Sequence, residues 1–507
     1  MRIEVVRLVA GSLSYPPGLR GRREAEERTI ERQPGESGAA RRGVRRGRLA
    51  GLCLALALAM LPLACRPPEP PRHLVILCID TLRADRVGHL GSPIARTTPA
   101  LDRLAASGVT FERAWAASSW TVPSVASLFT SRLPHRHGAG VAGEIKLLGD
   151  SSPPGGIRPG LATLAEVLQA RGFATASFAA NPFLYGRFRD GFEVAVTERV
   201  SAAEVVDRGL EWLAGREERR RFLYLHFMDA HEPNHPPQGY FEQFANPGAV
   251  PTPDDGRWID PWRSVDDLAD PAFLAHKDRR QAAYAAAVRY VDDEIARFLA
   301  GLARLGLRDD TLIVVTADHG EEFWEHAAIE RGWGDDPRGI WGVGHGHAFF
   351  EEQLRVPLIL AGGGVPDGVR SPCAASLIDV PPTAFALLGL EPEPDWQGTD
   401  LAGSFRRADP ACSGRAVFAA SSAYGPEGLA IRIGDEKFYR RGGQPDLRFD
   451  LARDPGEHQA LAVEATAAGR RLLSLAARLE AAGGTGSAAP PLTDPALVEE
   501  LRTLGYL

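Results

Sequence analysis

Cysteine is scarce in this sequence, and beyond residue 48 basic residues are fewer than acidic ones. Five cysteines among 507 residues, without a regular spacing, exclude a disulfide-rich scaffold and a zinc finger with cysteine ligands. Residues 1–48 hold twelve Arg and six Glu, a charge of +6, so the total of −7 leaves −13 for the remainder. Such an acidic body gives no support for nucleic-acid binding. The length is too great for one small domain and favours a large α/β unit with an additional subdomain.

An uncharged stretch near the N-terminus is typical of an export signal. Residues 49–65 carry no charge and follow an Arg-rich segment. The stretch ends in Leu-Pro-Leu-Ala-Cys and precedes a Pro-rich tether at 66–72, which resembles a bacterial lipoprotein signal with Cys65 as the lipidated N-terminus. We expect an exported protein, either a membrane-anchored lipoprotein or a periplasmic or extracellular one, with 1–48 as a disordered basic extension. A plain signal peptide and an uncleaved anchor stay open, because 17 residues is near the lower limit for a transmembrane helix.

Short apolar runs alternate with helical patterns between residues 73 and 400. Such runs are typical of buried parallel strands when helices separate them. The alternation predicts an α/β fold with a large doubly wound sheet, mixed or mostly parallel, flanked by helices. We expect strands at residues 73–79, 173–179, 222–227, 312–316 and 356–360, and helices at 98–107, 161–171, 202–214, 281–305 and 376–388.

The pattern changes after residue 400. Short strands separated by Gly-rich turns are expected at 417–421, 429–433 and 437–440, followed by a helix at 462–482. This predicts a C-terminal subdomain over 401–507, with a small antiparallel sheet and a helix, beside a main catalytic domain over 73–400.

Polar residues with catalytic or metal-binding chemistry lie where predicted strands end. Asp80 follows the first strand, His231 lies shortly after the third, and Asp318 and His319 follow the fourth. Ligand sites in doubly wound sheets lie outside the carboxyl ends of the strands. Histidines gathered at strand ends beside Asp are better candidates for a metal or anion site than scattered ones. Nine of the thirteen histidines fall in four clusters, at 135/137, 226/231/235, 319/326 and 345/347.

Five motifs in order resemble the sulfatase family of the alkaline phosphatase superfamily. They are ILCIDTLRAD, SWTVPS, TADHGE, EEQLRVP and FDLARDPGE, and the resemblance covers about residues 73–460. It implies a hydrolase of sulfate esters. In that family a cysteine before x-Pro-Ser-Arg is oxidised to formylglycine, whose hydrate attacks sulfur.

The sequence departs from the family pattern at the nucleophile. Thr121 stands in place of the cysteine and Val125 in place of the arginine, so the aldehyde-hydrate mechanism is excluded. Thr81 replaces the second of two adjacent Asp residues that calcium-binding sulfatases have. A threonine hydroxyl is a weak nucleophile and needs a metal or a base to activate it.

The remaining residues still imply a metal site. Asp80, Thr121, Asp318 and His319 match the ligand positions, and similar threonine sets occur in the superfamily's phosphoglycerol and phosphoethanolamine transferases. An imidazole beside carboxylates suits Mn²⁺ or Zn²⁺ better than Ca²⁺, and one or two ions are expected.

The resemblance also implies roles for three histidines. His231 and His345 match family positions near the leaving-group oxygen or the anion, and His137 is expected to join them as a catalytic residue. A structural alternative stays open for Thr121, because Thr-Val-Pro-Ser opens a helix well and its hydroxyl could simply cap that helix.

Two pairs of residues carry lesser expectations. Glu321 and Glu322 are expected to face solvent or to support a helix start. Cys373 and Cys412 could pair after export, which the sequence alone leaves open.

Three functions remain open. The first is an exported, metal-dependent hydrolase of anionic sulfate or phosphate esters with Thr121 as nucleophile. The second is a phosphoryl or phosphodiester transferase that uses the same residue. The third is an inactive sulfatase-like protein that binds a glycan or another anion. In each case the expected partner is anionic, such as a sulfated or phosphorylated glycan or lipid, and membrane contact is expected through a lipid anchor.

Overall fold

The computed structural model describes residues 69–140, 156–215, 219–250, 262, 264–405, 412, 414–463, 470, 473 and 474. The extension 1–48, the predicted signal 49–65 with Cys65, and most of the helix expected at 462–482 lie outside these residues. Within them, no helix combines the length and the apolar character needed to cross a lipid bilayer.

An eight-stranded sheet forms the centre of the described part of the chain. In sheet order its strands are β10 (Val369–Ser376), β2 (Gly108–Trp115), β9 (Leu358–Ala361), β6 (Thr311–Thr316), β1 (His73–Ile79), β5 (Arg221–Phe227), β3 (Ala174–Ala179) and β4 (Val194–Thr197). β9 runs antiparallel to both of its neighbours, and the other pairings in the sheet are parallel. The predicted mixed, mostly parallel sheet is therefore confirmed.

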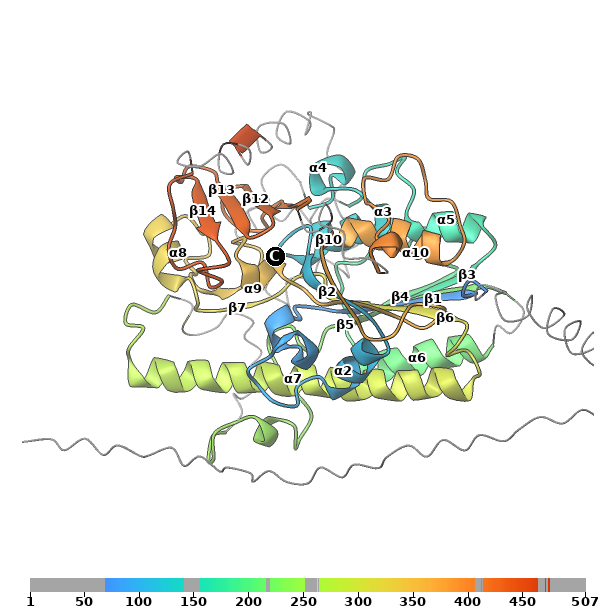
Figure 1. The fold of residues 1–507 in the computed structure, drawn as a ribbon. Coiled ribbons are helices and arrows are strands. Elements are labelled where there is room, and N and C mark those ends of the chain that lie inside the picture. Colours follow the sequence, from blue (N-terminus) through green and yellow to red (C-terminus); the bar gives the residue numbers. More distant parts are fainter. Residues whose placement is uncertain are drawn as a thin grey trace, which may run out of the picture. The chain divides into compact units, whose positions relative to one another are not determined.

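The middle strands are buried along their whole length. Every residue of β1, β5 and β6 is buried, so both faces of the sheet must be covered by helices. Figure 1 shows α2 (Pro99–Ala106), α6 (Ala202–Ala214) and α7 (Pro271–Arg304) along one face, and α3 (Thr121–Thr130), α5 (Leu164–Ala170) and α10 (Val380–Leu387) along the other. This is the layered arrangement of a doubly wound sheet.

Short elements connect these layers. They are α4 (Pro134–His137), α8 (Ala327–Trp333), α9 (Glu351–Leu354), the two-stranded ribbon of β7 (Glu322–Phe323) and β8 (Val343–Gly344), and the 3₁₀ turns at Ala84–Arg86, Gly88–Leu90, Gly186–Arg189, Phe241–Gln243, Leu377–Asp379 and Ala402–Phe405.

A second, antiparallel sheet follows in the C-terminal region. Its order is β11 (Ala416–Ala420), β12 (Gly428–Ile433), β13 (Glu436–Arg441) and β14 (Leu447–Asp450), which confirms the predicted small antiparallel sheet. Tyr439 and Phe449 pack against Phe350, which immediately precedes α9, and Trp115 at the end of β2 lies in the same apolar cluster. The small sheet is thereby fixed against the main one.

For part of the large sheet the sequence pattern predicted the wrong strand direction or did not predict the strand. The strand expected at 356–360 as parallel is β9, which is antiparallel. β2, β4 and β10 were not expected. β2 carries Glu112 and Arg113, β4 is only half-buried, and β10 contains Pro372. Polar residues and proline on outer strands weaken the apolar run on which the prediction depends.

The long helix α7 starts ten residues before the expected position. Asp270 caps it by accepting hydrogen bonds from the amides of Ala272 and Phe273, and Pro271 occupies its first turn. An aspartate cap followed by proline is a strong start signal, and it precedes the apolar pattern that set the prediction.

Candidate active site

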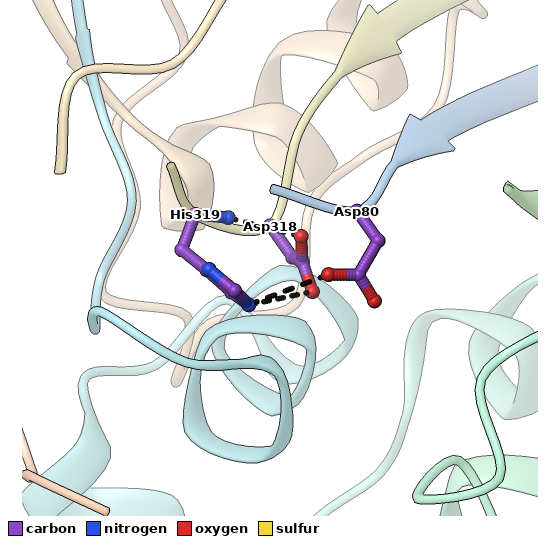
Figure 2. Close-up of side chains that lie close together, drawn as sticks. All are labelled: Asp80, Asp318 and His319. Atoms are coloured by element: carbon purple, nitrogen blue, oxygen red, sulfur yellow. Dashed lines mark hydrogen bonds and ion pairs between the residues drawn. The ribbon is translucent and has the colours of Figure 1, made fainter. Parts of the chain in front are cut away.

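Strand ends and one helix start bring the predicted metal-site residues together. Asp80 follows β1 and Asp318 lies just after β6, and these two strands are parallel neighbours. Thr121 is the first residue of α3. Figure 2 shows the carboxylates of Asp80 and Asp318 facing the ring of His319. The site therefore lies at the carboxyl edge of the sheet, as expected for this architecture.

Asp80, Asp318 and His319 form a compact set of donor atoms. One donor atom from each lies within 4.8 Å of the others. Nε2 of His319 is 3.5 Å from Oδ1 of Asp80 and 3.5 Å from Oδ2 of Asp318. Oγ1 of Thr121 is 3.3 Å from the same nitrogen. The structure thus brings together the four residues predicted to hold a metal.

Two buried carboxylate oxygens point to a cation at this place. Oδ1 of Asp80 and Oδ2 of Asp318 have no hydrogen-bond partner among the described residues, although both side chains are wholly buried. An anionic oxygen that is buried without a partner carries a large desolvation cost. Two carboxylates, an imidazole and a hydroxyl are donors that suit Mn²⁺ or Zn²⁺. The residues present fit the predicted metal.

The two carboxylates differ in their surroundings. Burial alone would raise the pKa of Asp80, but the hydrogen bond from His226 and the nearby His231 and His319 hold this pKa below its ordinary value. Burial and the negative charge of Asp80 raise the pKa of Asp318. Asp318 therefore carries the electrostatic penalty of the pair, which a positive ion would relieve.

The hydroxyl of Thr121 faces the site and does not cap its helix. The N-cap of α3 is Trp120, and no side chain caps this helix. Oγ1 of Thr121 instead lies 3.3 Å from His319 Nε2 and accepts a hydrogen bond of 3.2 Å from Nδ2 of Asn181. The capping alternative is wrong, since the hydroxyl is directed to the buried carboxylates and imidazole.

Two residues to which the sequence analysis assigned no role also contact the metal-site residues. Asn181, just after β3, donates from Nδ2 to Oδ2 of Asp80 at 2.7 Å as well as to Thr121. His226, on β5, donates from Nε2 to the same oxygen of Asp80 at 3.0 Å, while its Nδ1 lies 2.8 Å from the hydroxyl of Tyr224. β5 neighbours β1 and β3 is the next strand in the sheet, so the position of both residues near strand ends on this side of β1 was the available signal.

His231 and His345 lie beside the metal-site residues. The ring centres of His345 and His319 are 4.4 Å apart, and those of His345 and His231 are 4.8 Å apart. Nδ1 of His345 donates to Oε1 of Glu321 at 3.1 Å. Burial lowers the pKa of His231 to about 4 and, together with His319, lowers that of His345 well below its ordinary value. Both rings are therefore neutral at pH 7.

Glu321 and Glu322 are buried, which contradicts the solvent-facing position expected for them. They lie at the start of the β7–β8 ribbon, which follows β6 in the chain. The sequence pattern missed this because Glu is rarely buried unless it is paired, and the partners, such as His345, lie more than twenty residues away.

His137 does not contact the residues described above. Its Nε2 donates to Oγ of Ser127 at 2.9 Å, and its Nδ1 accepts from the amide of Ala139 at 3.1 Å. Both ring nitrogens are thus engaged, and the bond to Ser127 holds α4 against α3. The prediction of a catalytic role for His137 is corrected to a structural one.

The chain resembles known sulfatases in sequence. The profile of the family described as Sulfatase matches residues 72–390. Arylsulfatase A of Bos taurus is 26% identical over 505 aligned residues, covering 85% of this chain and 91% of that protein. Choline-sulfatase of Rhizobium meliloti (strain 1021) is 32% identical over 190 residues, covering 36% of this chain and 33% of that enzyme, so this second alignment spans a third of the relative.

Solved structures share the fold. A protein solved with its substrate D-glucosamine-2-N,6-O-disulfate superposes with a TM-score of 0.62 at 18% identity, covering 82% of this chain and 98% of that one. Phosphonate monoester hydrolase of Agrobacterium radiobacter gives 0.61 at 20% identity, covering 82% and 95%. At these identities the likeness establishes the architecture alone.

The structural assignment of His137 predicts a specific dependence of stability on pH. Burial lowers its pKa in the folded protein to about 3, from 6.5. Between these values the unfolded chain binds more protons, so His137 makes the folded state lose stability as the pH falls below 6.5. At pH 5 the loss is about 2 kcal/mol. The free energy of unfolding, measured in urea, should fall between pH 7.5 and 5 in both proteins. We expect this fall to be about 2 kcal/mol smaller in His137→Gln than in the parent. His135→Gln, at a half-exposed neighbour, is the control, and parallel profiles for parent and His137→Gln would contradict the assignment.

Proposed function

This chain belongs to the sulfatase family, and from that premise we propose that it is a metal-dependent hydrolase of anionic sulfate or phosphate esters with Thr121 as its nucleophile. The observation that carries the proposal is the position of Oγ1 of Thr121, which lies 3.3 Å from Nε2 of His319 beside two carboxylate oxygens without partners. The relatives named above hydrolyse sulfate or phosphonate esters by their names, which supports the reaction class.

Asp80, Asp318 and His319 would hold the divalent metal. Its charge, once bound, lowers the pKa of a neighbouring hydroxyl and offsets negative charge on the transferred group. Asn181 and His226 fix the carboxylate of Asp80 from the side away from His319, through two hydrogen bonds to the same oxygen. The carboxylate can then present only its other oxygen to the site.

Thr121 supplies the attacking oxygen. Its place in the first turn of α3 positions the hydroxyl, and the start of a helix that no side chain caps favours an anion next to it. In the proposed reaction the hydroxyl of Thr121 gives its proton to water, a bond forms between Oγ1 and sulfur or phosphorus, and the bond to the ester oxygen breaks. Water then cleaves the threonine ester, which releases sulfate or phosphate and restores the hydroxyl.

His231 and His345 serve the leaving group. Both rings are neutral in the absence of an anion, and an anionic ester bound beside them would favour their protonated forms. A protonated imidazole can give its proton to the departing oxygen. Glu321 holds Nδ1 of His345, so the other nitrogen of that ring is the one directed away from Glu321.

A transferase that passes the group from Thr121 to an alcohol differs only in the acceptor. The family name favours sulfate esters, whereas a threonine nucleophile beside a metal is chemically more natural for phosphate esters. The neighbour solved with a disulfated glucosamine supports an anionic ester in general. Binding of an anion without turnover is the remaining alternative.

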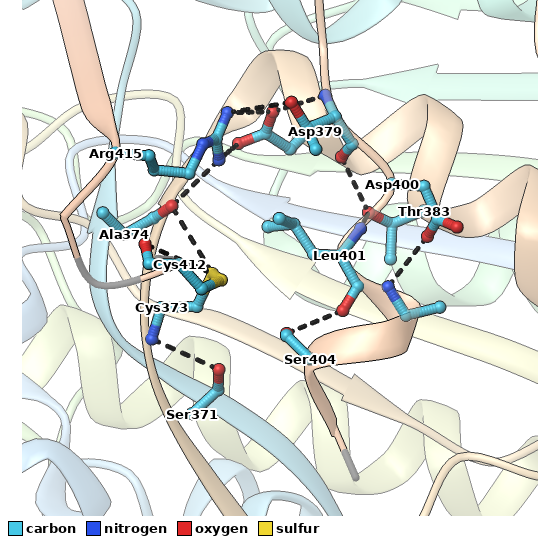
Figure 3. Close-up of a disulfide and its surroundings, with 12 residues drawn as sticks. Ser371, Cys373, Ala374, Asp379, Thr383, Asp400, Leu401, Ser404, Cys412 and Arg415 are labelled. Carbon is cyan, nitrogen blue, oxygen red and sulfur yellow. Dashed lines mark hydrogen bonds and ion pairs between the residues drawn. A yellow bond between two sulfur atoms is a disulfide. The ribbon is translucent and has the colours of Figure 1, made fainter. Parts of the chain in front are cut away.

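We further propose that the protein is exported and held at a membrane by a lipid on Cys65. The uncharged segment before Cys65 supports this, and so does the disulfide between Cys373 and Cys412, because disulfides persist in oxidising compartments. Figure 3 shows the disulfide next to Arg415, which donates to the carboxylate of Asp379 and to the carbonyl oxygen of Ala374. The disulfide links β10 to the chain just before β11.

Replacing the threonine tests the proposed nucleophile. We expect Thr121→Ala to lower kcat roughly 1,000-fold or more, since the attacking atom is lost, whereas Thr121→Ser keeps the hydroxyl and most of the activity. The assay uses zinc- or manganese-loaded protein with p-nitrophenyl sulfate, p-nitrophenyl phosphate and bis-p-nitrophenyl phosphate, with and without glycerol as an acceptor. An unchanged rate in Thr121→Ala would exclude the nucleophile. No turnover of any ester by the loaded parent would favour the anion-binding alternative, and glycerol ester formation would identify a transferase.

The lipid anchor predicts a defined N-terminus. Produced in a Gram-negative host, the mature chain is expected to begin at Cys65 and to carry the mass of a lipid, as read by mass spectrometry of its N-terminal peptide. Cys65→Ser should lack the lipid and leave the membrane fraction. Recovery of unprocessed peptides from residues 49–65 in the parent would contradict cleavage at Cys65.

The disulfide predicts a loss of stability on its removal. It closes a sequence separation of 39 residues, for which the chain-entropy relation gives about 4 kcal/mol. We expect replacement of both Cys373 and Cys412 by Ser to lower the free energy of unfolding by up to that amount in urea. A thiol reductant should destabilise the parent similarly and leave the double variant unaffected. Equal unfolding midpoints for the two proteins would contradict the prediction.

A further inference from the structure

A second group of buried ligand-type side chains lies next to the active site but outside it. Glu322 on β7, Glu330 on α8 and His347, shortly after β8, bring donor atoms within 4.8 Å of one another. All three side chains are at least nine-tenths buried. None of them takes part in the reaction proposed above.

One ring nitrogen of His347 lies close to both carboxylates. Its Nε2 is 3.2 Å from Oε2 of Glu322 and 3.1 Å from Oε2 of Glu330. One proton on this nitrogen can make only one straight hydrogen bond, so the second carboxylate is left with a poor one. Ligands of a tetrahedral metal, at bond lengths of about 2.0–2.1 Å, lie roughly 3.3 Å apart. The observed separations match that spacing.

The balance of charges also favours a cation. In the described part of the chain, no Lys or Arg side chain forms an ion pair with Glu322 or Glu330, so two buried carboxylates share a single imidazole. Oε1 of Glu330 is buried without a hydrogen-bond partner among the described residues. A divalent ion would neutralise both carboxylates and bind the orphaned oxygen.

The carboxylates are held in place by other groups, as metal ligands usually are. Gln353 donates from Nε2 to Oε2 of Glu322 at 3.0 Å, and the amide of His326 donates to Oε1 at 2.9 Å. The amide of Gly342 donates to Oε2 of Glu330 at 2.6 Å. These bonds fix the orientation of each carboxylate before any ion binds.

We propose that Glu322, Glu330 and His347 bind a second divalent ion, Zn²⁺ or Mn²⁺, with a structural role. The three ligands join the ribbon of β7 and β8 to α8, and so close off the excursion between residues 324 and 342. Glu322 adjoins Glu321, and His347 lies two residues beyond His345. The ion therefore stabilises the segment on which the Glu321–His345 pair is built.

A neighbouring pair provides a matched control. His326 donates from Nδ1 to Oε1 of Glu352 at 2.6 Å and from Nε2 to the carbonyl oxygen of Gly456 at 3.0 Å. Both nitrogens of this buried histidine are engaged, so Glu352→Gln removes a buried carboxylate beside a histidine without removing a proposed ligand.

The test is the number of zinc ions bound per full chain, measured by elemental analysis after chelation and reloading with Zn²⁺ alone. We expect two zinc ions in the parent and in Glu352→Gln. We expect one in Glu330→Gln, one in Asp318→Asn, and none in the variant that combines Asp318→Asn with Glu330→Gln. Zinc should raise the melting temperature of Asp318→Asn but not that of Asp318→Asn with Glu330→Gln. A single ion in the parent, or two in Glu330→Gln, would overturn the proposal.

Crystals of the zinc-loaded parent keep the test independent of how the variants fold. We expect an anomalous-scattering peak at the zinc edge between Nε2 of His347 and the carboxylates of Glu322 and Glu330. Absence of a peak there overturns the second site, whether or not a peak lies at Asp80 and Asp318. Loss of the Asp80–Asp318 peak alone would instead contradict the proposed active site.

Discussion

The organisation of this protein depends on the burial of two carboxylates that face each other. Asp80 and Asp318 are wholly buried at the ends of adjacent parallel strands. Two like charges in such surroundings repel strongly, because the effective dielectric constant inside a protein is far below that of water. Each has one oxygen bonded, by Asn181 and His226 for Asp80 and by the amides of Thr81 and His319 for Asp318, and one oxygen left without a partner. The free oxygens are directed to the same place, where His319 and Thr121 also lie.

The pairing of the strands fixes the relative positions of the two carboxylates. β1 is paired in parallel with β6 on one side and β5 on the other, so Asp80 and Asp318 emerge at one level of one edge, and His226 lies two residues earlier, beside Cys78. The amide of Asp80 also donates to the carbonyl oxygen of Phe227, which extends the ladder by one residue beyond β1. Thr81 has a φ of 60°, a rare conformation for a residue that is not glycine. The chain turns sharply there and gives its amide to Asp318.

The sequence was informative where function and local pattern coincide. The apolar runs before Asp80 and Asp318 identified β1 and β6, and the residues that follow them are the ones the structure brings together. Asn181 and Glu321 could not be assigned in this way, because an amide after a strand and a glutamate in a loop acquire a role only through partners distant in the chain. His137 was misassigned for the same reason. Its cluster suggested chemistry, whereas its contacts with Ser127 and Ala139 are local and structural. β2 and β10 were missed because tertiary packing, and not apolar periodicity, places polar residues and a proline in outer strands.

The electrostatics of the site explain why an anionic substrate would depend on metal at this protein. The body of the chain is acidic, so long-range attraction does not draw an anion to it. The histidines beside Thr121 do not supply the missing charge, since burial keeps His231 and His345 neutral near pH 7. Arg338 lies close enough to lower the pKa of His345 further, but it is paired with Asp336 and stacked on Tyr424. An ion held by Asp80, Asp318 and His319 would supply positive charge beside Thr121. Binding of that ion would then favour binding of the ester, because it would offset the negative charge that an anion meets at the two carboxylates.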